Sequence, residues 1–260
     1  HRGYDMVRIL EQVYLGADGI YGTPLGVSST FVIIIVVLGA LLEKTGASGV
    51  LMDIAVSMTR NSRGGPAKAA VVGSSLMGMI SGTAVANVLT TGTISIPLMR
   101  RGGYRPAVAG AVEAVASTGG QLMPPIMGAA AFLMADIMEV PYLDITKAAL
   151  LPALLFYIAV FASVHLEAVK TGLKPLESID IPDVAQSLRN SGHVLFSIPV
   201  FIGTLISGYS VMYSSLAGIV CLLALSLLRY SSRLNPRQLI AAAVSAAEAI
   251  LPVALATATA

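Results

Sequence analysis

Residues 69–99 read AAVVGSSLMGMISGTAVANVLTTGTISIPLM and contain no charged side chain. One helix over this stretch would be about 46 Å long, whereas the hydrocarbon core of a membrane is about 30 Å thick. Basic residues flank both ends: Arg60, Arg63 and Lys68 precede the stretch, and Arg100, Arg101 and Arg105 follow it. Because basic residues collect on the cytoplasmic side, we expect both ends there, which makes the segment a re-entrant hairpin that turns at Ser81-Gly82-Thr83. A single, strongly tilted helix is the alternative.

The composition of the whole chain makes a membrane the expected solvent. Of the 260 residues, 55% are hydrophobic and 12% are charged, and the mean hydropathy is +0.81. A soluble protein carries about 25% charged residues, because it needs a surface that water can wet. The net charge of +2 is too small for the electrostatic surface of a nucleic-acid-binding protein. We therefore predict an all-α polytopic membrane protein that contacts the lipid bilayer and has no nucleic-acid partner.

A second apolar stretch, residues 107–135, has its one charge at Glu113 and is interrupted by STGGQLMPP at 117–125. Glycine and proline are the poorest residues for a continuous helix. The two prolines cannot donate to the carbonyl groups four residues before them, so two backbone oxygens lose their helical partners. Lipid cannot bond these oxygens, which must therefore meet protein, water or a bound ion. This pattern predicts a broken transmembrane helix over about 106–138.

The remaining segments before residue 166 also show helical patterns. We expect a spanning helix within 19–42 and a short interfacial helix over 48–59, where apolar residues recur at helical spacing. A further apolar helix is expected over about 142–165. Together with the hairpin, at about 66–99, and the broken helix, these elements make residues 1–165 one structural unit.

The second part of the chain looks like the beginning of another such unit. A connecting loop is expected over 166–192, and residues 193–228 are expected to form two helices that separate near Ser207-Gly208-Tyr209. Residues 239–260 are expected to repeat the order of an interfacial helix and a short apolar arm. This repetition suggests two halves related by an inverted internal repeat, of which the second, 193–260, is truncated. Because the chain starts at His1 and stops within an apolar pattern, we expect a fragment of a longer protein.

Two polar islands interrupt the apolar sequence, at 81–87 and at 117–121. They offer hydroxyl, amide and carbonyl oxygens, which are the ligands that a small, hard cation prefers. The carbonyl ends of half-helices bind cations and their amino ends bind anionic groups, so one site can hold sodium while its neighbour holds a carboxylate. The alternative is that these serine and threonine side chains only bond back to their own helices.

Glu113 is the one ionisable residue within the apolar stretch 107–135. It lies about 12 Å along a helix from Arg105 and shares a face with Ser117 and Gly120, four and seven residues further on. A carboxylate at membrane depth is by default a candidate functional group. The alternative is a structural glutamate at the membrane interface that pairs with Arg105 or with an arginine across the bundle.

Enzyme functions find no support in the sequence. No glycine-rich loop with lysine is present to bind a nucleotide, and His1, His165 and His193 are too dispersed to bind a metal together. The single cysteine, Cys221, excludes an internal disulfide. We therefore predict no catalytic residues and no cofactor.

Several motifs resemble the large membrane subunit of tripartite ATP-independent periplasmic (TRAP) transporters. They are SGTAVAN at 81–87, IPLM at 96–99 with Gly103-Tyr104, the run from Glu113 through STGGQLMPPIMG at 117–128, GTPLG at 22–26 and LEKTG at 42–46. Taken together, they are most similar to the branch in which the small four-helix subunit is fused ahead of the large one. The resemblance covers nearly the whole chain.

The resemblance implies an elevator-type secondary transporter of the bacterial or archaeal cytoplasmic membrane, with inverted repeats that each carry a re-entrant hairpin. Such systems import organic acids with sodium as the coupling ion and receive the substrate from a periplasmic binding protein, here of the TAXI type. Carried over to this chain, the resemblance implies a substrate site at Thr83, Asn87, Thr118 and Gln121. The sodium site that it implies consists of Ser81, Gly82, Asn87, Ser117, Gly119 and Gly120.

Two other classes of membrane protein remain as alternatives. A channel would use similar broken helices, but it would need neither a binding protein nor two repeats. A purely structural membrane scaffold would tolerate alanine at Asn87 and Gly120.

Overall fold

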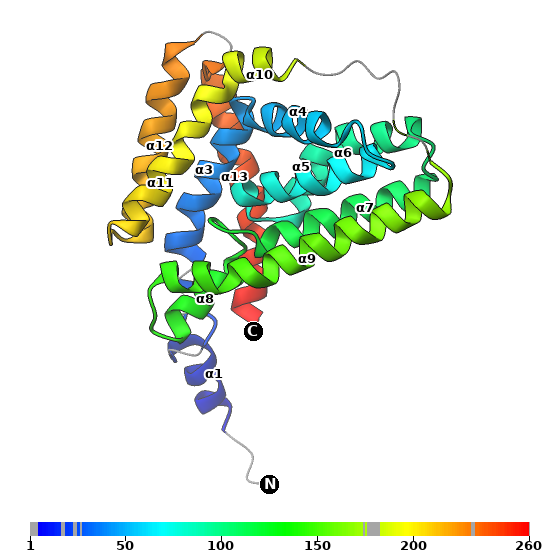
Figure 1. Ribbon diagram of the computed structural model, residues 1–260. Coiled ribbons are helices and arrows are strands. Elements are labelled where there is room, and N and C mark those ends of the chain that lie inside the picture. The colour runs from blue at the N-terminus through cyan, green and yellow to red at the C-terminus, as the bar shows by residue number, and fades with distance from the viewer. Residues whose placement is uncertain are drawn as a thin grey trace.

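The computed structural model describes residues 5–16, 19–22, 25–26, 28–173, 175, 183–229 and 232–259, and the regular structure within them is helical. An upright bundle is formed by α3 (Ile33–Lys44), α11 (Ser197–Ile206), α12 (Val211–Leu228) and α13 (Pro236–Thr259) (Figure 1). A lateral arm extends from it and consists of α4 (Ala47–Thr59), α5 (Gly65–Ser81), α6 (Ala84–Arg101), α7 (Pro106–Gly119) and α9 (Tyr142–Lys170). The remaining elements are α1 (Met6–Leu15), η1 (Ser28–Val32), η2 (Gly120–Leu122), α8 (Ala129–Ile137), α10 (Val184–Ser191) and η3 (Gly192–Phe196).

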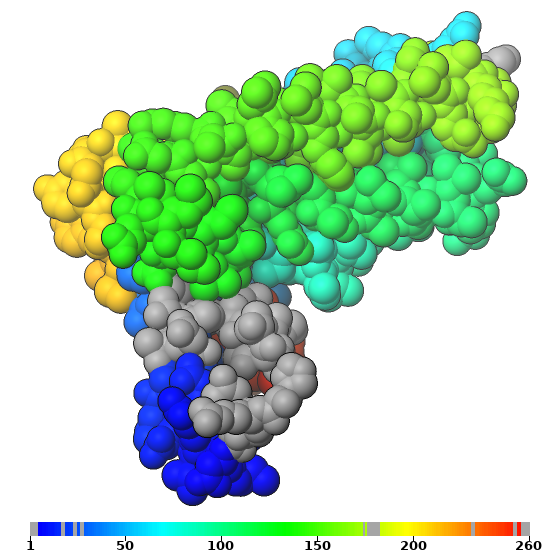
Figure 2. Space-filling view, turned by 90° about the horizontal axis from the view of Figure 1, so that it is seen from below, coloured from blue at the N-terminus to red at the C-terminus, as the bar shows by residue number. Residues whose placement is uncertain are grey.

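Two of the described helices are long and apolar enough to cross a membrane, namely α9, with 29 residues, and α12, with 18. A third candidate is the pair formed by residues 29–44 and α4, which bends by 69°. The surface of α9 is open in the view from below (Figure 2), and large apolar side chains such as Leu151 and Ile158 are exposed on it. Water would not tolerate such a surface, so lipid or other protein must cover it. The prediction of an all-α polytopic membrane protein is confirmed.

Gly46 produces the bend between α3 and α4, because its φ of +85° is a left-handed conformation that favours glycine. On α3 the side chains of Ile35, Leu38 and Leu42 are at most 1% exposed and form the centre of the larger apolar core. A Cβ atom on Gly39 would lie 2.5 Å from the carbonyl oxygen of Ile80, so α3 touches the end of α5 directly. This contact joins the upright bundle to the lateral arm.

The uncharged stretch, residues 69–99, lies in two helices, α5 and α6, which pack against each other (Figure 1). The turn between them is Gly82-Thr83, where Gly82 has a φ of +61° and lies too close to the carbonyl oxygen of Met127 for any Cβ atom. Thr83 caps α6 by accepting a hydrogen bond from the N–H of Ala86 at 3.3 Å. The chain thus turns at the predicted residues instead of continuing as one long helix.

The second apolar stretch is interrupted where the glycines and prolines predict it. The helix α7 ends at Gly119, η2 adds one short turn, and α8 begins at Ala129. The carbonyl oxygen of Gly120 accepts from the N–H of Met123 at 3.1 Å, and that of Gln121 accepts from the N–H of Gly128 at 2.8 Å. Both oxygens that the prolines release therefore meet protein.

The predicted connecting loop over 166–192 is wrong at both ends, because α9 continues to Lys170 and α10 begins at Val184. The charges of Glu167 and Lys170 do not stop the helix, since a helix tolerates charged side chains that reach solvent. It ends where Gly172 adopts a φ of +67°.

The predicted interfacial helix and short arm over 239–260 are also not seen. One continuous helix, α13, spans Pro236–Thr259 and packs along α3. Its sequence is rich in alanine, the best helix former, and contains no glycine. Within the upright bundle, the predicted separation of two helices near residue 208 does occur, between α11 and α12, where Gly208 has a φ of +87°.

We predict that Gly82→Ala destabilises the hairpin, because the new Cβ atom meets the Met127 carbonyl oxygen at 2.5 Å in a left-handed conformation. The expected loss is on the order of 1–3 kcal/mol, measured as a lower thermal unfolding temperature of the purified protein in detergent. Gly110→Ala in α7 is the matched control, since its Cβ atom meets nothing within 4 Å. Equal unfolding temperatures for the two variants would contradict the assigned turn.

Candidate functional site

A cluster of polar side chains lies inside the lateral arm, where α5, α6 and α7 meet. Its members are each at most 2% exposed. They are Ser74 from α5, Asn87, Thr91 and Ser95 from α6, and Glu113 and Ser117 from α7. We call this group the buried polar cluster.

The carboxylate of Glu113 is the centre of the buried polar cluster. The hydroxyl of Ser117 donates to its Oε1 atom at 2.9 Å, and the hydroxyl groups of Thr91 and Ser95 also donate to it. Among the described residues no basic side chain forms an ion pair with Glu113. The ion pair that these residues do form joins Lys147 to Asp144 on the surface. The predicted alternative, a pair with Arg105 or another arginine, is therefore not seen in the described part of the chain.

Asn87 ties the three helices together. Its Nδ2 atom donates to the carbonyl oxygen of Ser74 on α5 at 2.9 Å and lies 3.4 Å from that of Ser117 on α7. The hydroxyl of Thr91, one turn further along α6, lies 2.8 Å from the carbonyl oxygen of Asn87 and 3.4 Å from its Oδ1 atom. A buried amide that bonds two other helices holds both at a fixed distance from its own.

Two glycines permit this close approach. A Cβ atom on Gly78 of α5 would lie 2.3 Å from the Cα atom of Gly120, and one on Gly120 would lie 2.7 Å from the Nδ2 atom of Asn87. No larger residue fits at either position without displacing backbone. The break in the second apolar stretch therefore rests directly on the first arm of the hairpin.

The residues suggested as site residues fall into three places. Asn87, Ser117 and Gly120 meet at the buried polar cluster, together with Glu113. Ser81, Gly82, Thr83 and Gln121 lie at or beside the hairpin turn. Thr118 and Gly119 contact neither: the exposed Thr118 hydroxyl bonds back to the carbonyl oxygen of Ala114 at 2.7 Å, and Gly119 packs against the ring of Phe156.

A cavity of about 570 Å³ opens at the turn of the hairpin, and we call it the tip pocket. Its walls come from the start of α6, from the loop and helix after the break, and from α13. Thr83, Thr90 and Gln121 supply neutral polar groups, and Glu43 and Glu248 supply carboxylates. Thr90 donates to Glu43 at 3.0 Å. The size of this cavity is typical of a small-molecule site.

Sequence reasoning missed Ser74, Thr91 and Ser95. A signal for two of them was present, because Asn87, Thr91 and Ser95 recur every four residues and so form one polar stripe on an apolar helix. Glu43 and Glu248 carried no such signal, since only the packing of α13 beside α3 brings them to the same cavity.

Membrane-crossing helices, a helical hairpin, a broken helix and buried polar groups at their junction are features that membrane transport proteins combine. Residues 2–260 match the model of the tripartite ATP-independent periplasmic transporter, DctM component, and the chain belongs to this family. This match confirms the resemblance to the large membrane subunit of TRAP transporters.

Among curated proteins, the chain is 28% identical over 170 residues to the C4-dicarboxylate TRAP transporter large permease protein DctM of Pseudomonas aeruginosa. This match covers 65% of the chain and 39% of that protein. The uncharacterized protein YgiK of Salmonella typhimurium is 26% identical over 173 residues, which are 66% of the chain and 40% of that protein. The chain thus spans about two fifths of the length of these relatives.

We predict that Glu113→Ala destabilises the protein more than Glu113→Gln does, because alanine leaves buried hydroxyl groups without an acceptor. The free energies of unfolding of the two variants should differ by an amount on the order of 1–3 kcal/mol. Thermal unfolding in detergent measures this difference. Asp136→Asn, at an exposed carboxylate, is the control and should change little. If Glu113→Ala unfolds at the wild-type temperature, the hydrogen bonds assigned to this carboxylate are wrong.

Proposed function

We propose that this chain forms part of the permease of a secondary active transporter that imports organic acids together with sodium ions. The observation that carries the proposal is the buried polar cluster, in which a carboxylate, hydroxyl groups and an amide converge without a basic side chain. A buried carboxylate is costly unless a cation or a proton balances its charge. Oxygen ligands of this kind suit a small, hard cation such as sodium.

The residues expected to hold the sodium ion are Asn87 and Ser117, with Gly120 allowing the close approach and Glu113 supplying the charge. Ser81, Gly82 and Gly119 belong to the same proposal through the family resemblance, with their backbone carbonyl groups as the candidate ligands. The proposal requires no cofactor besides the coupling ion.

The tip pocket is the proposed position of the substrate. Thr83 and Gln121 line it, and α6 begins there. The N-terminus of a helix carries a partial positive charge, which here lies at the pocket. A substrate carboxylate is therefore expected to face the hairpin tip, with Asn87 one turn behind it. Thr118 is the weakest member of the proposed substrate site, because its hydroxyl bonds back to its own helix.

The proposal includes the partners that the family resemblance implies. They are a periplasmic substrate-binding protein of the TAXI type and a small membrane subunit, fused to the large one, in the cytoplasmic membrane of a bacterium or archaeon. An elevator-type movement of the hairpin unit between inverted repeats would expose the site to each side in turn.

The test is uptake of labelled organic acids by proteoliposomes that contain the complete permease, with and without the binding protein and a sodium gradient. Asn87→Ala should lower the sodium-driven uptake rate at least about tenfold, since it removes a buried amide that joins three helices. Ser163→Ala is the control, because the exposed Ser163 hydroxyl bonds only to its own helix, and it should transport normally. An uptake rate that depends on neither sodium nor the binding protein, and that Asn87→Ala leaves unchanged, would instead indicate a channel or a scaffold.

A second prediction concerns the coupling ion. Glu113→Gln keeps the shape of the side chain but removes its charge, so the sodium concentration for half-maximal uptake should rise about tenfold, corresponding to roughly 1.4 kcal/mol. Uptake at saturating substrate is followed while sodium is varied at constant ionic strength. An unchanged sodium dependence in a correctly inserted Glu113→Gln variant would show that the carboxylate is not part of the ion site.

A further inference from the structure

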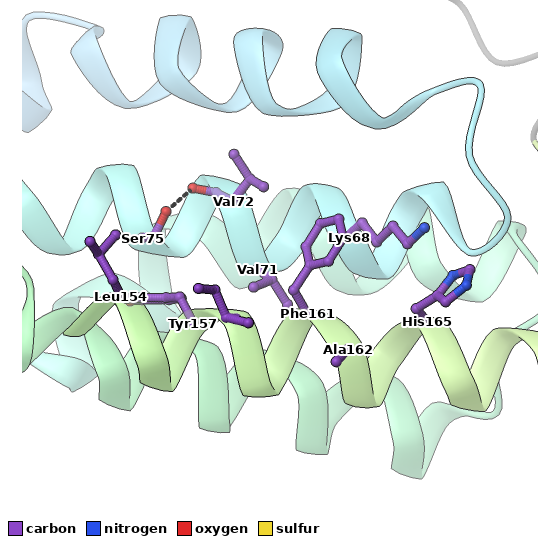
Figure 3. Close-up of a pocket in the computed structure, with 10 residues that line it drawn as sticks. Lys68, Val71, Val72, Ser75, Leu154, Tyr157, Phe161, Ala162 and His165 are labelled. Atoms are coloured by element: carbon purple, nitrogen blue, oxygen red, sulfur yellow. Dashed lines mark hydrogen bonds between the residues drawn. The ribbon is translucent and has the colours of Figure 1, made fainter. Parts of the chain in front are cut away.

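A groove of about 490 Å³ runs between α5 and α9 on the outer side of the lateral arm (Figure 3). Its walls are single faces of the two helices, since positions 68, 71, 72 and 75 recur at helical spacing, as do positions 154, 157, 158, 161, 162 and 165. From position 154 to 165 the groove wall extends about 16 Å along α9. We call it the lysine groove.

Most of the lysine groove is apolar, but one end of it is not. Leu154 and Ser75 lie at the end near the hairpin turn, and Lys68 and His165 lie at the opposite end (Figure 3). Between them the lining consists of side chains such as Val71 and Ile158. The groove therefore combines a long apolar channel with a basic end.

Lys68 has 5% of its residue surface exposed, and its Nζ atom, which makes no hydrogen bond to the described residues, stays accessible. Its Nζ atom lies 5.2 Å from the centre of the Phe161 ring. Among the described residues no carboxylate lies within ion-pair distance of it. The stem of Lys68 packs against the protein while its ammonium group stays accessible, so this end of the groove presents a positive charge that an anion can bind.

His165 supplies a second polar atom without a partner. Its Nδ1 atom is buried and makes no hydrogen bond to the described residues. Buried polar groups are normally hydrogen-bonded, so this nitrogen lacks the partner that such groups usually have. Figure 3 shows the imidazole ring and the Lys68 ammonium group at the same end of the groove.

We propose that the lysine groove binds an anionic phospholipid, with its phosphate at Lys68 and His165 and an acyl chain along the apolar faces of α5 and α9. The phosphate pairs with the ammonium group, and the chain covers Leu154 and Ile158, which are 43% and 63% exposed in the protein alone. The arginines at the base of the hairpin indicate the cytoplasmic leaflet, where basic pockets between helices bind anionic headgroups. This inference does not depend on the transported substrate or on the coupling ion.

The test uses the complete permease purified in neutral detergent and titrated with phosphatidylglycerol or with phosphatidylcholine of identical acyl chains. Bound lipid is counted by native mass spectrometry. The wild type is expected to prefer phosphatidylglycerol, and Lys68→Gln to weaken that binding at least about tenfold. Lys147→Gln is the matched control, because this exposed lysine lies on α9, which forms the other wall of the groove, but does not line the groove and pairs with Asp144. It should bind lipid as the wild type does.

Three further measurements separate the proposal from simpler explanations. Lys68→Arg keeps the charge and should retain the preference for phosphatidylglycerol, which covers the case in which Lys68→Gln fails to fold. Inorganic phosphate should not displace the lipid; if it does so at equal concentration, the site binds phosphate alone and the proposal is wrong. Equal binding of the two lipids by the wild type, or equal losses in Lys68→Gln and Lys147→Gln, would also overturn it.

Discussion

The side-chain amide of Asn87 is the contact on which the lateral arm depends. It lies on α6 and reaches the backbone carbonyl groups of Ser74 on α5 and Ser117 on α7. Inside an apolar protein that lipid surrounds, an amide without partners would be costly, so this geometry selects one arrangement of the three helices. Gly78 and Gly120 are required at the same junction, because any side chain at either position would force the helices apart.

This junction links the two sites that the proposed function requires. The helix α6 begins at the tip pocket, where Thr83 caps it, and one turn later Asn87 enters the buried polar cluster. Thr91 and Ser95 continue the same face to the Glu113 carboxylate. An ion that balances the charge of the Glu113 carboxylate would therefore contact α6, and the first turn of α6 lines the tip pocket. The stretch of α6 from Thr83 to Ser95, about three helical turns, would be a short and direct physical connection between a substrate and a coupling ion.

The first arm of the hairpin has two functional faces. Ser74 and Gly78 face the buried junction, whereas Lys68, Val71 and Val72 face the lysine groove. Because both faces belong to one helix, a lipid held between α5 and α9 would stabilise the helix that supports the proposed ion site. In this proposal the apolar exterior of α9 both faces the membrane and holds a specific lipid.

The sequence alone determined the membrane setting, the turn at Gly82-Thr83, the break after Gly119 and the family, because each depends on local composition or on residues next to one another. Length, charge and the conformational limits of glycine and proline decide such features without tertiary contacts. The sequence also pointed to Asn87, Ser117, Gly120 and Glu113, which stand out as polar or small residues in apolar stretches. It failed at the ends of α9 and α13, where charges and an expected repeat were poor guides to helix length.

Only the tertiary structure decided which of these residues meet. Thr118 and Gly119 turn away from the cluster although they neighbour Ser117 and Gly120, because successive residues of a helix point in different directions. Glu43 and Glu248 reach one pocket, and Lys68 and His165 one groove, through the packing of helices that are far apart in the chain. Such contacts depend on how helix faces fit together, and that fit is a property of the packed helices and of no single segment.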